Sequence, residues 1–115
     1  MTLEELYTAM LTALPDLAEA SFYDHIEVDE GQEIFPPFIF VHEEAGDPFM
    51  ADDQVYFLGI DNKIDVYTAD RSTTVRNSII NFLNGLNLPF TLQLGEIDSD
   101  TMLYVDSFVV SLDNI

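Results

Sequence analysis

The sequence contains no cysteine and only three basic residues, Lys63, Arg71 and Arg76, among 115. Without cysteine the chain forms no disulfide bond and no thiolate metal site. Glycine and proline, with 5 of each, are too few for a low-complexity or collagen-like chain. No apolar run approaches the ~20 residues that a membrane-spanning helix needs, and the acidic start MTLEELYTAM is unlike a secretory signal. We therefore expect no membrane partner.

The scarcity of basic residues makes the chain strongly acidic. The 22 Asp and Glu residues against three Lys and Arg give a formal net charge of −19. Binding to a nucleic-acid backbone requires several cations that displace condensed counterions, and three scattered cations do not supply them. The charge instead favours an acidic surface that repels DNA, mimics DNA or meets a basic protein.

Two segments have the periodicity of amphipathic helices. Thr2 and Glu5 form a capping-box pattern, and Pro15 ends the apolar stripe that follows, so the first helix should end near Leu14. Asp70, Ser72 or Thr73 can cap the second helix, which Gly85 closes. The apolar positions of the second helix are Val75, Ile79, Phe82, Leu83 and Leu86.

Strand patterns occupy the remaining apolar segments. A half-exposed strand is expected around Phe22, Tyr23, Ile26 and Val28, and Pro36-Pro37 precedes strand formers at 38–41. Two further strands are predicted at 90–94 and 102–112, the latter apolar on both faces as a central or interface strand would be. With 48% hydrophobic residues, the chain is predicted to be one α+β domain, 1–115, in which two amphipathic helices pack on a mostly antiparallel sheet.

A hairpin is predicted at the centre of that sheet, with strands 55–60 and 63–68 joined by a turn at Asp61-Asn62. In that register Val55, Phe57, Ile64 and Val66 form the core face. The opposite face is too apolar to be exposed to water, so we expect a helix or another subunit to cover it. The residues predicted to form this subunit interface are Tyr56, Leu58, Ile60 and Tyr67.

Residues 42–53, HEEAGDPFMADD, are predicted to be a surface loop, because acids, a glycine and a proline separate two apolar runs. A loop of about a dozen residues is often functional. We expect it to contact a partner through Glu43, Glu44, Asp47, Phe49, Met50, Asp52 and Asp53.

Catalytic and metal-binding patterns are weak throughout. Around His42 the acids suit hard cations, but no calcium-loop order and no second histidine accompany them, so a solvated loop is favoured over a metal site. Asp61 and Asp65 lack the environment that general acid–base catalysis needs. We assign no catalytic, cofactor-binding or metal-ligating residue and expect no enzyme activity.

The segments FIFVHEEAGDPFMADD (38–53), QVYFLGID (54–61) and KIDVYT (63–68), with the helix after Arg71, resemble the tail terminator, or tail completion, proteins of long-tailed bacteriophages that infect Gram-positive hosts. The resemblance extends in element order over most of the chain. It implies an α/β sandwich of one sheet with flanking helices, without cofactor or enzyme activity. It also implies a virion location in the tail or neck, after assembly in the host cytoplasm.

The same resemblance implies a ring, commonly of six subunits, that caps the tail tube and stops its polymerisation. The implied partners are the major tail tube protein on one side and the head-completion or stopper protein on the other. We expect DNA to pass through an acidic channel without specific binding. Two alternatives remain open: a neighbouring stopper protein of the neck, and an acidic DNA mimic that inhibits a DNA-binding protein.

Overall fold

The computed structural model describes residues 1–18, 21–24, 36–51, 54–71, 73–100 and 102–112. They form helix α1 (Leu3–Ala13), a short helix α2 (Pro15–Ala18), strands β1 (Ser21–Tyr23), β2 (Phe38–Ala51) and β3 (Gln54–Thr68), helix α3 (Thr73–Gly85), and strands β4 (Phe90–Ile97) and β5 (Tyr104–Val110). The strands make one sheet in the order β1-β2-β3-β5-β4. Only the β1–β2 pair is parallel, so the predicted α+β class with a mostly antiparallel sheet is confirmed.

Both predicted amphipathic helices form, and α1 begins with the capping box that its sequence indicates. At the start of α1 the Thr2 N–H donates to Glu5 Oε1 at 3.0 Å, and the Glu5 N–H donates to Thr2 Oγ1 at 3.1 Å. The helix ends at Ala13, before Pro15, which instead begins α2. Helix α3 ends at Gly85, so Leu86 lies beyond the helix and is 37% exposed. We had expected Leu86 to belong to the apolar stripe of this helix.

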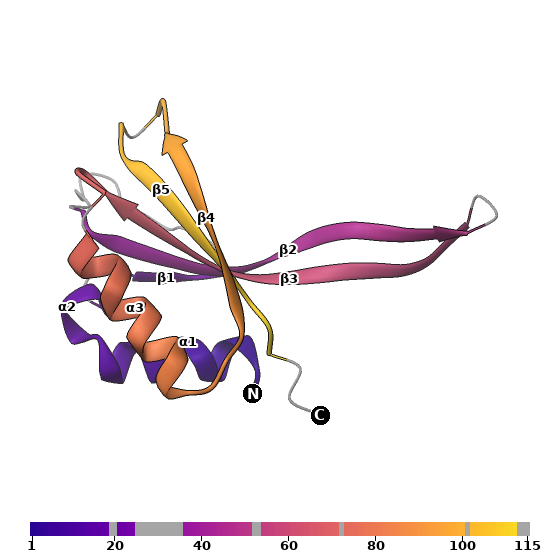
Figure 1. The fold of residues 1–115 in the computed structure, drawn as a ribbon, viewed down its shortest axis with the longest axis horizontal. Helices are drawn as coiled ribbons and strands as arrows, with labels where there is room; N and C mark the ends of the chain where they lie inside the picture. Colours follow the sequence, from indigo (N-terminus) through magenta and orange to yellow (C-terminus); the bar gives the residue numbers. More distant parts are fainter. Residues whose placement is uncertain (19–20, 25–35, 52–53, 72, 101, 113–115) are drawn as a thin grey trace.

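The core lies between the two longer helices and one face of the sheet (Figure 1). Alternate residues of β2, β3 and β5 point into it, as the period of two requires. The fully buried side chains include Leu6 and Met10 of α1, Ile79 and Leu83 of α3, and Ile39, Val41, Ile64 and Phe108 of the sheet. The body of the fold therefore needs only the first residues of β2 and the last residues of β3.

The predicted hairpin turn at Asp61-Asn62 is wrong. Strand β3 runs without interruption from Gln54 to Thr68, and the chain reverses between Ala51 and Gln54, which pair with each other. Asn62 pairs with Glu43 on one side and with Val110 on the other, so it lies inside the sheet. Ladder pairing of Asp61 with β2, and of Asn62 with both β2 and β5, outweighs the turn preference of Asp-Asn.

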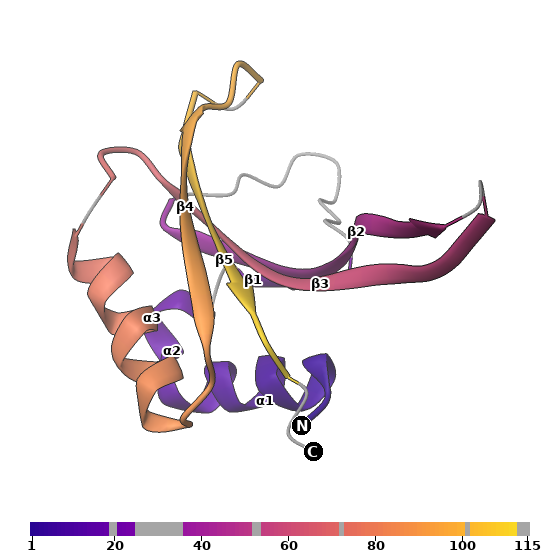
Figure 2. The same cartoon turned by 45° about the vertical axis from the view of Figure 1, so that its right-hand side comes forward.

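The predicted surface loop at 42–53 is also wrong, since β2 continues as far as Ala51. Beyond the body, β2 and β3 form a two-stranded ribbon, residues 44–51 and 54–61, which we call the arm. Figures 1 and 2 show the arm projecting from the rest of the fold. It projects along the longest dimension of the whole molecule, which is 49 Å. The half-exposed strand predicted at 22–28 is observed as Ser21–Tyr23, while Ile26 and Val28 lie outside the described residues.

Candidate functional site: the arm and its base

The arm is paired only within itself among the residues that the structure describes. Strand β1 pairs with β2 at residues 39–41, and β5 pairs with β3 at residues 62–68. Past those points each strand of the arm has its partner on one side, and on the other side its backbone edge pairs with none of the described residues. An isolated two-stranded ribbon is marginally stable in water, and unpaired edges are templates for further pairing.

The predicted interface residues are distributed differently from our expectation. Leu58 pairs with Pro48 and Ile60 with Ala45, both in the arm, whereas Tyr67 pairs with Phe38 in the body. Tyr67 lies seven positions after Ile60, or roughly 23 Å along the strand. The four residues therefore do not form one cross-strand cluster, because the turn that would have brought them together does not exist.

The predicted partner-contact residues lie mostly on β2 rather than on a loop. Glu43 and Glu44 are exposed and face Asn62 and Asp61 in the ladder. Asp47, Phe49 and Met50 lie further along β2, in the arm. Asp52 and Asp53 lie outside the described residues.

Polar side chains join three strands at the base of the arm. His42 Nε2 lies 2.7 Å from Asp65 Oδ2, and the Ser107 hydroxyl donates to Asp65 Oδ1 at 2.6 Å. Next to them, Lys63 Nζ lies 2.5 Å from Glu44 Oε2. Lys63 lowers the pKa of Glu44, chiefly by donating a hydrogen bond to it. These contacts fix the direction in which the arm leaves the body.

Ser107, Asp65 and His42 are the residue types of a hydrolase triad, but their order differs. In a triad the histidine lies between the serine and the carboxylate and removes the serine proton. Here Asp65 lies between Ser107 and His42 and contacts both. The arrangement links the three strands and places no histidine of the described residues against the Ser107 hydroxyl, so its geometry suits a structural clasp.

Aromatic rings cover the open face of the sheet, opposite the helices. The Phe38 ring stacks on Tyr67 with centroids 4.5 Å apart and meets Phe22 edge-on at 5.9 Å. Phe40 stacks on His42 at 4.2 Å. Tyr67, one of the predicted interface residues, is thus half-buried against its own chain.

Burial of Tyr67 gives the first prediction. Burial, followed by the charges of Asp65 and Asp98, raises the pKa of Tyr67 above its ordinary value. The folded chain therefore binds the phenolic proton more tightly than the unfolded chain does. Below the pKa of the unfolded chain this difference adds to the free energy of unfolding, and the contribution is lost as the pH rises above about 10. Urea unfolding across this range should show wild type losing stability more steeply than Tyr67→Phe. Equal slopes would contradict this assignment.

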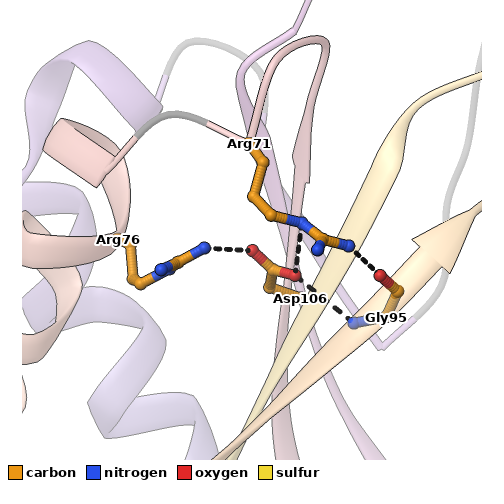
Figure 3. Close-up of polar contacts among 4 residues, drawn as sticks. All are labelled: Arg71, Arg76, Gly95 and Asp106. Atoms are coloured by element: carbon orange, nitrogen blue, oxygen red, sulfur yellow. Dashed lines mark hydrogen bonds and ion pairs between the residues drawn. The ribbon is translucent and has the colours of Figure 1, made fainter.

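A second polar cluster joins α3, β4 and β5 (Figure 3). Asp106, 4% exposed, lies between two arginines: Arg71 Nε is 3.6 Å from Oδ1 and Arg76 Nη2 is 3.5 Å from Oδ2. The Gly95 N–H donates to Asp106 Oδ1 at 3.3 Å, and Arg71 Nη2 donates to the Gly95 carbonyl. The Arg71 guanidinium also lies 4.6 Å from the centre of the Tyr104 ring.

Gly95 permits this cluster by bringing β4 close to β5. A Cβ atom on Gly95 would lie 1.8 Å from the Val105 carbonyl oxygen, which no side chain tolerates. The register between β4 and β5 shifts at this point, between Leu94 and Ile97. The sequence signal for the cluster is an aspartate inside the apolar run 102–112, which by itself does not indicate the two arginines that it meets.

Comparison with known proteins finds no match among protein-family models, curated proteins or solved structures. No helix in the described parts of the chain is long and apolar enough to cross a membrane. Within those same residues, no three His, Asp or Glu side chains lie close enough together to hold a metal ion.

Proposed function

We propose that the chain is a ring-forming structural protein of the phage tail terminator type, which assembles through its arm. The observation that carries the proposal is that the arm extends beyond the body with both of its outer edges unpaired in the described structure. A ribbon of this kind gains stability when another chain contacts it. The sequence resemblance and the α+β fold support the same role.

A ring of identical subunits uses heterologous contacts, in which one patch of each subunit meets a different patch of its neighbour. A projecting arm and a separate body provide two different patches. In the proposed assembly, commonly of six subunits, the ring lies at the head-proximal end of the tail tube. One side of it contacts the major tail tube protein and the other contacts the head-completion or stopper protein.

The net charge of −19 fits a ring through which DNA moves. Acids that face a channel repel phosphates, so DNA passes without being held. The exposed carboxylates of Glu43 and Glu44 at the base of the arm are candidates for this lining. A ring structure whose channel is neutral or basic would contradict this part of the proposal.

The proposal is tested with the tail tube protein encoded in the same genome. Tubes that polymerise in the presence of the chain should stop growing and carry a ring at one end, as seen by electron microscopy. Tubes of unchanged length with bare ends would contradict a terminator. Binding to the head connector alone would indicate a stopper, and a monomer that inhibits a DNA-binding protein would indicate a DNA mimic.

A further inference from the structure

The direction of the backbone groups along each strand follows from two hydrogen bonds. The Ser111 N–H donates to the Pro89 carbonyl at 2.9 Å, so this pair is hydrogen-bonded and the pair Phe90–Val110 next to it is not. Because antiparallel pairs alternate, the N–H and C=O groups of Phe90, Leu92 and Leu94 point away from β5. They form the free outer edge of β4.

The same alternation carries across the sheet to the arm. On β5, the backbone groups of Asp106, Phe108 and Val110 point away from β4 and therefore bond to β3. Their partners on β3, which are Val66, Ile64 and Asn62, direct their own backbone groups toward β5. The Asp24 N–H donates to the Val41 carbonyl at 2.8 Å, and Val41 is the partner of Ile64, which confirms this phase. The register shift between Ala45 and Pro48 adds its extra residue to β2, so the alternation continues along β3 and places the backbone groups of Leu58 and Ile60 on the outer edge of the arm, where β5 no longer runs.

The two outer edges of the arm differ in how they are protected. On β2, Pro48 pairs with Leu58 in a position that turns its nitrogen outward, so that edge lacks a donor there. Acids at Glu43, Glu44 and Asp47 add charge to the same strand. On β3, residues 54–60, QVYFLGI, contain neither proline nor charge. Natural proteins usually protect such an edge with proline or charge. The β3 edge lacks both, so it is the edge of the arm that is better suited to pair with another strand.

Strand β4 offers a matching edge in the same chain. Its residues 90–95, FTLQLG, also contain neither proline nor charge, and Leu94 is 57% exposed. Strand β4 spans Phe90–Ile97, eight residues, and the β3 side of the arm, 54–61, has the same length. Figure 1 places β4 on the body and the arm projecting away from it, so the two edges meet only between different copies.

Charge favours this pairing over other contacts between copies. The arm and its base, residues 42–61, carry six acids and no Lys or Arg. Residues 71–95, which include α3 and most of β4, carry no acid and two arginines. In a chain of charge −19, the acidic arm of one copy meets the least repulsion against this part of another copy.

From these observations we infer that the β3 edge of the arm pairs with the β4 edge of a neighbouring copy, so that the sheet continues from one subunit to the next. This inference rests on the proposed ring and identifies its two contact surfaces. The contact is heterologous, as a closed ring requires. Backbone hydrogen bonds supply the pairing, so it depends on donors at Leu58 and Leu94 more than on their side chains.

Proline substitutions test the pairing, because they remove outward-facing donors without removing a ladder hydrogen bond. Leu58→Pro should block the arm edge and Leu94→Pro the β4 edge, and native mass spectrometry should find each variant monomeric. The matched variants Leu58→Ala and Leu94→Ala keep both donors and should still form rings. An equimolar mixture of the two proline variants retains one complete contact and should give a dimer of about 26 kDa, twice the 13.0 kDa chain.

Several outcomes would overturn the inference. Proline variants that still form rings would leave the proposed ring standing and exclude this contact. Loss of the ring in only one of them would indicate pairing between identical edges. Wild type that stays monomeric at every concentration, both alone and with tail tubes, would instead contradict the ring itself.

Hydrogen exchange provides a second measurement that needs no substitution and does not depend on whether the proline variants fold. In the assembled wild type, the amides of Leu58, Ile60, Leu92 and Leu94 should exchange at least tenfold more slowly than in diluted monomer. Equal rates in the two states would count against pairing at these edges.

Discussion

We expect a chain whose arm is shortened to stay folded and to lose the proposed ability to form rings. In this variant residues 45–60 are replaced by Asn-Gly, which joins Glu44 to Asp61. These two residues are direct ladder partners, and the alternation of backbone groups makes theirs a hydrogen-bonded pair. Asn-Gly is the preferred two-residue connection for such a pair, so the shortened hairpin closes without strain.

The body should tolerate this change because its core lies elsewhere. Leu6, Val41, Ile64 and Phe108 are fully buried between the sheet and the helices, and all remain. The clasp of His42, Asp65 and Ser107 and the Lys63–Glu44 ion pair also remain. Because loop length has a small effect on stability, the free energy of unfolding should change by about 1 kcal/mol or less.

A matched control keeps the arm at full length. Replacing only Asp52-Asp53 by Asn-Gly changes the connection between Ala51 and Gln54, which pair with each other, and removes two acids. This control should still form rings, as measured by native mass spectrometry alongside the shortened variant. If the shortened variant assembles as well as the control, the arm does not carry assembly.

Loss of the Asp106 carboxylate has the largest expected effect on folding. Asp106→Ala leaves Arg71 and Arg76 without their shared anion and leaves the Gly95 N–H without an acceptor. Breaking a buried ion pair costs about 3–5 kcal/mol. The arginine side chains retain 31% and 22% exposure and recover some hydration, so we expect the lower end of that range, about 3 kcal/mol.

Urea unfolding of the variant and of a surface control measures this effect. Asp100→Ala removes a carboxylate from an exposed residue of the turn between β4 and β5 and should change stability by less than about 0.5 kcal/mol. Asp106→Asn keeps an acceptor oxygen and should fall between the two. Equal stabilities for Asp106→Ala and Asp100→Ala would show that the cluster does not hold β4, β5 and α3 together.

The sequence predicted the elements whose causes are local. Helix α1 forms where Thr2 and Glu5 cap an apolar stripe, and α3 ends at the glycine that its pattern indicates. Strand β5 was expected to be central because it is apolar on both faces, and it lies between β3 and β4. These features depend on a few neighbouring residues, so no tertiary information was needed.

The hairpin error shows what local patterns leave undecided. Two dipeptides in this segment suit a two-residue connection between apolar strands: Asp52-Asp53 and Asp61-Asn62. The choice depends on register: reversal between Ala51 and Gln54 pairs Ile39 with Val66 and Val41 with Ile64. That register buries all four of these side chains on the helix face, a gain that arises only when the helices are in place.

The structure gives the predicted site residues a different form from the one expected. The segment 42–61 was expected to carry a partner-contact loop and an interface face, and it forms the arm instead. The edge of β4 was not considered, because an unprotected edge becomes visible only when the strand order is known. The Asp106 cluster likewise joins residues from three segments that are distant in the sequence.

The mass of the purified wild-type chain under native conditions tests the central claim most directly. Six copies of a 13.0 kDa chain weigh about 78 kDa. The ring predicts a species near that mass, or near another whole multiple typical of a closed ring, that forms as the concentration rises or when tail tubes are added. A chain that remains at 13.0 kDa under all of these conditions would contradict assembly through the arm.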